Sequence, residues 1–259
     1  AWMDECIQRR LKSNGSVQAP VAFITCNSSP ATKASPAFFT HYDVETLFHE
    51  FGHGLQHMLT KVDYAGISGI SGVEWDAVEL PSQFMENWCW EKDVLDTFAF
   101  HFETNQKLPN KLFKKLLATK NYNSGMALLR QIEFSLFDFL LHMNEEKKKT
   151  KLTEMVLQSV RKETSLITVH KNNKFQNSFA HIFSGGYAAG YYSYKWAEVL
   201  SADAFMAFKE NKLVDRKVGT NFMKKILETG GSKPALELFV DFRGREPIIE
   251  PLLKSLGLK

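Results

Sequence analysis

The sequence predicts a mainly α-helical fold with a small β element near the N-terminus. Aromatic residues make up 13% of the 259 residues, and most of them fall in stretches where apolar positions recur with helical spacing. One early stretch, residues 21–26, instead has the β-branched and aromatic composition of a strand. Because 44% of the residues are hydrophobic, the chain can form a substantial core, in one large domain or two small ones.

The other expected elements follow in order from this strand. A Ser-, Pro- and Ala-rich loop covers 27–36, a helix covers 43–60, and a glycine- and serine-rich loop covers 65–72. A second helix is expected at 78–91, with Pro81 in its first turn, where the missing N–H costs nothing. Amphipathic spacing predicts the remaining helices at 124–143, 151–163, 187–209, 217–229 and 232–241, with a short terminal helix after Pro247.

Charge, hydropathy and cysteine content exclude several classes of protein. The 32 basic and 29 acidic residues give a net charge of +3, too even a balance to indicate a polyanion, so we expect no nucleic acid partner. The charged run 145–149 indicates a solvated turn. Charged residues interrupt the most apolar stretch, 126–143, well short of the roughly 18 apolar residues of a membrane span, so we expect no membrane partner. The scattered Cys6, Cys26 and Cys89 favour a reducing compartment, most simply the cytoplasm.

One segment has the spacing of a metal site. Residues His49 to His53 fit the pattern HExxH, in which two histidines one helical turn apart hold a zinc ion and the glutamate acts as base. A shuffled chain of this composition would contain the pattern about 0.02 times. On a helix, His49, His53 and Glu45 lie within about 80° of one another. The apolar residues point nearly opposite, so we expect them to be buried and the histidines to face a cleft: Val44, Leu47, Phe51, Leu55, Met58 and Leu59.

A catalytic zinc ion needs a third protein ligand. A metzincin-type site would place a histidine where Leu59 stands, so that class is excluded. His57 lies one further turn along, but ligands at i, i+4 and i+8 spread over about 12 Å of helix and do not converge, so we expect His57 to be exposed. The remaining option is a carboxylate from another helix, and residues 78–88 offer Glu79 and Glu86, seven positions apart on one face.

These two segments together resemble the thimet oligopeptidase family of zinc metallopeptidases, most of all its bacterial cytosolic branch. In that family, a glutamate that opens an E-x-P-S-Q motif follows the HExxH helix, and Glu79 opens such a motif here. The resemblance implies a zincin-like fold of the gluzincin type, with one Zn²⁺ ion held by His49, His53 and Glu79. It also implies that Glu50 is the general base for a zinc-activated water, and that Glu86 lies behind the site.

A second block, residues 181–194, resembles the glycine-rich loop and tyrosine cluster of the same family. From the residues alone, tyrosines at i, i+4 and i+7 would favour an aromatic core on one helix. The resemblance implies instead that His181 and Tyr194 are catalytic and stabilise the transition state. It further implies a set of substrate-binding residues in the cleft: Tyr187, Tyr191, Gly185 and Gly186.

Three other residues receive secondary roles. Glu45, or Asp76 in the loop before the second helix, is expected to accept the second ring N–H of a zinc-bound histidine. Near the end of the chain, residues 242–247 weakly resemble the family's C-terminal motif. We expect Arg245 in this motif to be a structural anchor rather than a catalytic group.

The resemblance implies a zinc-dependent endopeptidase that cuts internal bonds of short oligopeptides. It covers the whole chain but only the C-terminal part of a family member. We therefore interpret residues 1–259 as a C-terminal catalytic domain, with short peptides and the N-terminal helical half of the same polypeptide as partners. Alone, this piece is expected to fold, to bind zinc and to be weakly active or inactive. Two alternatives stay open: a metal-free peptide-binding or structural helical domain, and a zinc exopeptidase with a His/His/Glu site.

Overall fold

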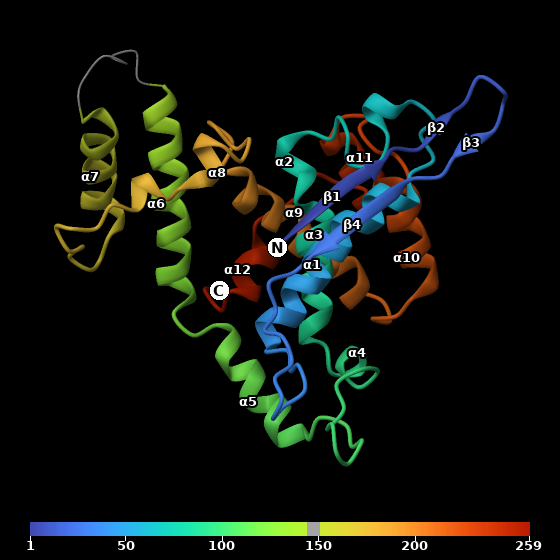
Figure 1. Ribbon diagram of the computed structural model, residues 1–259, viewed down its shortest axis with the longest axis horizontal. Coiled ribbons are helices and arrows are strands. Elements are labelled where there is room, and N and C mark those ends of the chain that lie inside the picture. The colour runs from blue at the N-terminus through green and yellow to red at the C-terminus, as the bar shows by residue number, and fades with distance from the viewer. Residues whose placement is uncertain (144–150) are drawn as a thin grey trace.

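The computed structural model describes residues 1–143 and 151–259 and has two lobes (Figure 1). The charged run 145–149, expected as a turn, lies outside the described residues. The larger lobe contains the strands and most of the helices. The smaller lobe contains α6 (Ser124–His142), α7 (Leu152–Thr164) and α8 (Ala180–Phe183). The mainly helical class with a small sheet near the N-terminus confirms the expected fold class.

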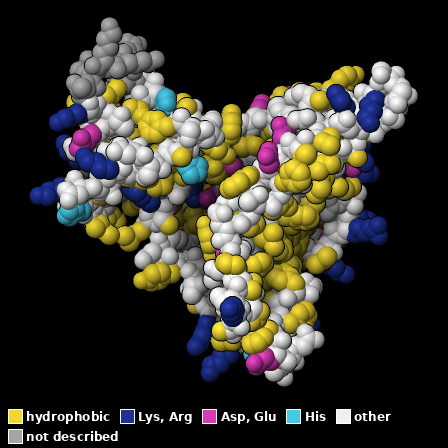
Figure 2. Space-filling model, viewed as in Figure 1, with side chains coloured by type: hydrophobic (Ala, Val, Ile, Leu, Met, Phe, Trp, Pro, Cys, Tyr) yellow, Lys and Arg dark blue, Asp and Glu magenta, His cyan; other side chains and the backbone are white. Residues whose placement is uncertain are grey.

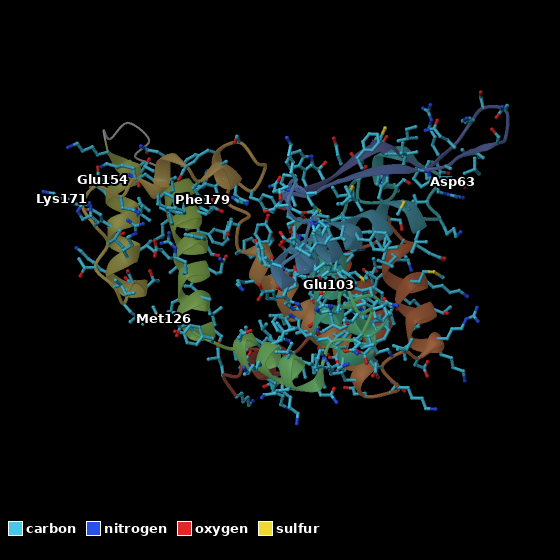
Figure 3. All side chains as sticks on the ribbon, turned by 60° about the horizontal axis from the view of Figure 1, so that its bottom comes forward. Asp63, Glu103, Met126, Glu154, Lys171 and Phe179 are labelled. Carbon is cyan, nitrogen blue, oxygen red and sulfur yellow. The ribbon has the colours of Figure 1, made fainter. Side chains whose placement is uncertain are left out.

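The two lobes lie on either side of a wide notch. Figure 2 shows this hollow in the space-filling view, between the smaller lobe and the larger one. In a second view, Glu154 and Phe179 lie in the smaller lobe, whereas Asp63 lies at the opposite end of the larger one (Figure 3). Within the described residues, no helix is both long enough and apolar enough to cross a membrane.

The β element is a pair of short antiparallel ribbons. β1 (Trp2–Ile7) pairs with β4 (Val21–Thr25). The expected strand at 21–26 is therefore confirmed, whereas its partner β1 was not predicted. Along β1, exposed and half-buried residues alternate from Trp2 to Glu5, because successive side chains point to opposite faces. β2 (Arg10–Leu11) and β3 (Val17–Gln18) extend the hairpin.

The first long helix, α1 (His41–Leu59), begins directly after its N-cap residue, Thr40. The side chain of Thr40 accepts the backbone N–H of Asp43, and the carboxylate of Asp43 accepts the backbone N–H of Thr40. This reciprocal pair is a capping box, which satisfies backbone donors that have no partner inside the helix. The helix expected at 43–60 is therefore confirmed, with a start two residues earlier.

The buried face of α1 was predicted only in part, because Leu55 and Leu59 pack against the core but three other apolar residues of the predicted face do not. Leu47, Phe51 and Met58 are 37%, 41% and 40% exposed, whereas His57, expected to be exposed, is 0% exposed. The reason is that Gly52, on the other face, lets the backbone at Pro81 and Ser82 come close. The buried positions of the helix are therefore mainly polar or small: Glu50, Gly52, His53, Gly54, Gln56 and His57.

The helix expected at 78–91 is broken into three pieces. α2 (Trp75–Val78) precedes α3 (Leu80–Glu86), which continues into the 3₁₀ helix η2 (Asn87–Trp90). Pro81 has no N–H to donate to the carbonyl four residues earlier, so a continuous helix cannot run through Glu79. The break leaves Glu79 between α2 and α3, with its side chain free to point toward α1.

The helices of the smaller lobe follow the prediction, and one helix before them was missed. α6 and α7 occupy the expected ranges within two residues. α5 (Asn110–Lys120) was not expected, because its sequence is dominated by lysines and has no fully buried residue. A small aromatic and aliphatic core holds the lobe together: Phe137, Val156, Leu157, Phe179, Ile182 and Tyr191.

The helix expected at 187–209 begins six residues late. α9 (Ser193–Lys209) is preceded by a turn in which Gly186 has φ +86° and Ala189 has φ +56°. Left-handed residues are incompatible with a right-handed helix, so Tyr187 and Tyr191 precede the helix and do not share its face. The helical spacing of the tyrosines was therefore misleading.

The C-terminal helices complete the core of the larger lobe. α10 (Arg216–Phe222) continues into the π-helix η4 (Met223–Leu227), and α11 (Ala235–Arg243) and α12 (Glu250–Ser255) follow. The two terminal nitrogens of Arg245 each donate to the fully buried carboxylate of Asp203 at 2.6 Å, so Arg245 lies in a structural cluster as expected. The core combines α3 and α9 with these helices, and its main residues are Leu80, Phe84, Leu200, Phe205, Phe208, Phe222, Phe239 and Phe242.

Candidate metal centre

Two imidazoles from α1 meet one carboxylate from the break between α2 and α3. The Oε2 atom of Glu79 lies 3.3 Å from Nε2 of His49 and 3.2 Å from Nε2 of His53. The potential ligand atoms of these three residues all lie within 4.8 Å of one another. Glu79 is 2% exposed and His53 is 8% exposed, so the cluster is buried rather than on an open surface.

Gly52 is the residue that lets the two chain segments come so close. A Cβ atom at this position would lie 2.4 Å from the carbonyl oxygen of Pro81 and 2.6 Å from Cα of Ser82. Real Cβ atoms do not approach other atoms so closely, so only glycine fits this helix crossing. The glycine inside the HExxH segment thus sets the distance between the histidines and Glu79.

The spacing of the three ligand atoms fits a zinc ion. With bonds of about 2.0–2.1 Å, two ligands of a tetrahedral zinc ion lie about 3.4 Å apart. The observed separations of 3.2 and 3.3 Å are near this value and longer than the roughly 2.7–2.9 Å of a direct charged hydrogen bond. Two imidazole nitrogens and one carboxylate oxygen are also the donor set of a catalytic zinc site.

Neighbouring side chains hold the carboxylate of Glu79 in place. The hydroxyl of Tyr187 donates to Oε1 at 2.6 Å, and the hydroxyl of Ser82 donates to Oε2 at 2.9 Å. Although burial alone would raise the pKa of Glu79, its contacts with His49 and His53 hold it well below the usual range. The carboxylate is therefore ionised, which is the form that binds a cation.

The residue behind His49 is Glu86, which the resemblance placed behind the site; the expectation that Glu45 or Asp76 would accept the ring N–H was wrong. Nδ1 of His49 lies 2.6 Å from Oε1 of Glu86. Glu45 accepts the indole N–H of Trp90 at 2.6 Å, and Asp76 accepts the hydroxyl of Tyr192. The seven-residue spacing of Glu79 and Glu86 was the available signal, because α3 turns both toward α1. Glu86 thus fixes which nitrogen of His49 faces the site.

The protonation of His49 depends on these carboxylates. Burial alone would lower the pKa of His49, but the hydrogen bonds and charges of Glu79 and Glu86 raise it to about 10. In the absence of a cation, the ring is therefore an imidazolium at neutral pH. A zinc ion in the site would replace that proton.

Glu50 lies on the same turn of α1 as the two histidines and is 6% exposed. Its charge is among the influences that raise the pKa of Tyr194, after burial and the charge of Glu79. Glu50 is therefore close to the place where the HExxH helix meets the tyrosines.

Four of the aromatic residues of the second block lie together although they do not share a helix. The rings of Tyr187 and Tyr194 stack at 4.8 Å, and the ring of His181 lies 5.7 Å from that of Tyr191 and 6.1 Å from that of Tyr194. Trp75 packs against Tyr187 at 4.6 Å, a contact that no sequence pattern indicated. His181 is exposed, so a ligand can reach it from solvent.

The tyrosine hydroxyls have different surroundings. Tyr187 donates to Glu79, and Tyr191, which is 7% exposed, donates to Oε1 of Gln131 on α6 at 3.0 Å. Burial raises the pKa of Tyr191 to about 12, and burial with the charge of Glu79 raises that of Tyr194. Both phenols stay protonated at neutral pH and can act as hydrogen-bond donors.

Gly185 and Gly186 form the tight turn after His181. A Cβ on Gly185 would lie 3.0 Å from Cα and the carbonyl oxygen of His181, and Gly186 has φ +86°. At Gly186 a Cβ would also touch the ring of Trp75 at 3.4 Å. These glycines bring the chain from His181 to Tyr187 within the space available.

Comparison with known proteins identifies relatives over the whole chain. Residues 1–258 match peptidase family M3. The chain is 50% identical to oligopeptidase A of Salmonella typhimurium over 260 residues, and 49% identical to organellar oligopeptidase A of Arabidopsis thaliana over 265 residues. It is also 33% identical over 259 residues to a dipeptidyl carboxypeptidase of Salmonella typhimurium. All of this chain is covered, but only 38%, 34% and 38% of these relatives, respectively.

Proposed function

Because the chain belongs to peptidase family M3, we propose that it carries the zinc centre of an endopeptidase that hydrolyses internal bonds of short peptides. The observation that carries the proposal is the convergence of His49, His53 and Glu79, with separations that fit the edges of a zinc tetrahedron. These three residues would hold the ion. When bound, zinc supplies a Lewis acid and lowers the pKa of a coordinated water toward about 7.

The chain's own residues provide the proton transfers and the charge stabilisation. Glu50 takes the proton of the attacking water and passes it to the amine that leaves. His181 and Tyr194 donate hydrogen bonds to the oxygen that becomes negative when the peptide carbonyl is attacked. The raised pKa of Tyr194 supports this role, since the phenol keeps its proton at neutral pH. Tyr187, Tyr191, Gly185 and Gly186 form the wall of the peptide site on the side of the smaller lobe.

The names of the relatives support short peptides as substrates. Two proteins about 50% identical to this chain carry the name oligopeptidase A, whereas the dipeptidyl carboxypeptidase is 33% identical. An exopeptidase is therefore the second candidate. Mass spectrometry of the products separates the two, because an endopeptidase yields internal fragments and a dipeptidyl carboxypeptidase yields dipeptides.

The chain spans about two fifths of the length of these relatives or less. We propose that further parts of the polypeptide complete the peptide channel, and that this chain alone binds zinc but cleaves peptides weakly. The free thiols Cys6, Cys26 and Cys89 support a reducing compartment such as the cytoplasm.

The test combines metal analysis with peptide cleavage. We expect Glu50→Gln to retain zinc at the wild-type level while hydrolysis of a quenched fluorescent peptide falls by about 10²- to 10⁴-fold, because the base is lost and the ligands are intact. Glu45→Gln, one turn earlier on the same helix, is the matched control and should keep near-normal turnover. If Glu50→Gln cleaves as fast as the wild type, Glu50 is not the base.

A further inference from the structure

One fully buried carboxylate in the smaller lobe points at the turn that carries the tyrosines. Asp138 on α6 is 0% exposed. Its Oδ1 accepts the backbone N–H of Ala189 and its Oδ2 accepts that of Tyr191, both at 2.9 Å. Nδ1 of His142, one helical turn further along α6, lies 2.8 Å from Oδ1. The two oxygens thus hold two amides of one turn, about fifty residues away in the sequence.

The turn held by Asp138, which we call the tyrosine turn (residues 185–191), has an unfavourable backbone. Ala189 has φ +56°, a conformation that residues with a Cβ rarely adopt. Such a residue persists when the surrounding structure holds it in place. The paired hydrogen bonds from its own N–H and that of Tyr191 are the contacts that do so.

Asp203 provides a useful contrast within the same chain. It is also 0% exposed, but its carboxylate is bound by the guanidinium groups of Arg243 and Arg245 as well as by the N–H of Ile248. Among its described contacts, Asp138 has no such arginine partner. Its hydrogen bonds go to the tyrosine turn and to one histidine, which indicates that its role is to hold the turn.

The tyrosine turn leads directly to the candidate centre. Tyr187 at its middle donates to Glu79, while Tyr191 at its end contacts the ring of His181 and that of Tyr194. A shift of the backbone between Tyr187 and Tyr191 would therefore move several groups of the site together.

We propose that Asp138 is a positioning residue of the proposed peptidase: it clamps the tyrosine turn so that His181 and Tyr194 face the reacting carbonyl. This inference rests on the proposed function. Asp138 touches neither the metal ligands nor the notch, so it acts only through the backbone that it holds.

The test compares Asp138→Asn with Asp203→Asn in the zinc-loaded chain. An asparagine amide at position 138 would turn an N–H toward one of the two backbone donors, so one hydrogen bond is lost and the turn moves. We expect kcat to fall by about tenfold or more, with KM changed much less and zinc content unchanged, since small displacements of catalytic groups have effects of this size. Asp203→Asn removes an equally buried charge outside the site and should leave kcat near the wild-type value.

Two further measurements separate positioning from simple destabilisation. Hydrogen–deuterium exchange of the peptide covering 185–192 should be faster in Asp138→Asn and unchanged in Asp203→Asn. Adding Ala189→Gly to Asp138→Asn should recover part of the lost kcat, because glycine adopts positive φ without strain.

Different results would overturn the positioning role of Asp138 and the proposed function. Unchanged exchange in Asp138→Asn, or a kcat equal to that of Asp203→Asn with an active wild type, would overturn the positioning role. A wild-type chain that binds no zinc would count against the proposed function, and the exchange comparison would still decide whether Asp138 clamps the turn.

Discussion

Single residues show that the centre depends on their neighbours as much as on the HExxH pattern. His49 and His53 could be predicted because one helical turn separates them, and Glu79 because of the motif that it opens. The burial of His57 could not be predicted, because it results from contacts with β1 and the 65–72 loop. Its Nε2 lies 2.9 Å from the carbonyl oxygen of Ile7, and Gly69 packs against its ring.

Glu86 gives a prediction at this scale. Replacing it in Glu86→Gln removes the charged acceptor behind His49 and should weaken zinc binding by about 10- to 100-fold, the usual effect of losing such a partner. Competition with a chromophoric chelator measures the change. Glu45→Gln, which alters the acceptor of Trp90, is the control and should bind zinc like the wild type. Equal affinities in all three proteins would show that Glu86 does not orient His49.

Zinc binding should release a proton at neutral pH. The pKa of His49 is raised to about 10 in the chain without a cation, so the ring is protonated below that pH and must lose its proton to become a ligand. The apparent zinc affinity should therefore increase as the pH rises toward 10. Calorimetric titration at pH 7.5, in two buffers of different ionisation enthalpy, counts the protons released. Identical heats in both buffers would show that no proton is released and would contradict a protonated His49 in the chain without a cation.

At the scale of elements, caps and glycines determine how the helices meet. The capping box fixes the start of α1, and Gly52 fixes its crossing with α3. Long amphipathic helices such as α6 were predictable from their spacing. α5 was not, because it has no fully buried face, and the tyrosine turn was not, because three tyrosines at helical spacing imitate a helix.

The helix crossing can be tested with two matched alanines. Gly52→Ala would place a Cβ 2.4 Å from the carbonyl oxygen of Pro81, so α1 and α3 must separate. We expect a loss of about 1–3 kcal/mol in the free energy of unfolding, together with weaker zinc binding. Gly54→Ala would meet only the side chains of Ile24 and Met58, at 3.5 Å or more, and should stabilise the helix slightly. Thermal melts and zinc titrations compare the two variants. Equal stability and equal zinc affinity in both would contradict the role of Gly52.

At the scale of the whole molecule, the candidate centre lies where the two lobes meet. Two hydrogen bonds join them there, Tyr187 to Glu79 and Tyr192 to Asp76. Beside them, within the larger lobe, the side chain of Gln83 on α3 donates to the backbone carbonyl of Tyr194 on α9. In each pair the partners are more than a hundred residues apart, so no local pattern predicts this junction. The helical class was predictable, whereas the two lobes and the notch between them were not (Figure 2).

The most direct measurement of the central claim is zinc X-ray absorption spectroscopy on the natively purified chain, combined with metal analysis. We predict one zinc ion per chain with two imidazole ligands and oxygen from a carboxylate, at about 2.0–2.1 Å. Glu79→Ala should lose most of the zinc while the helical content is kept. A chain that retains no zinc, or a spectrum without imidazole scattering, would contradict a metal centre built from His49, His53 and Glu79.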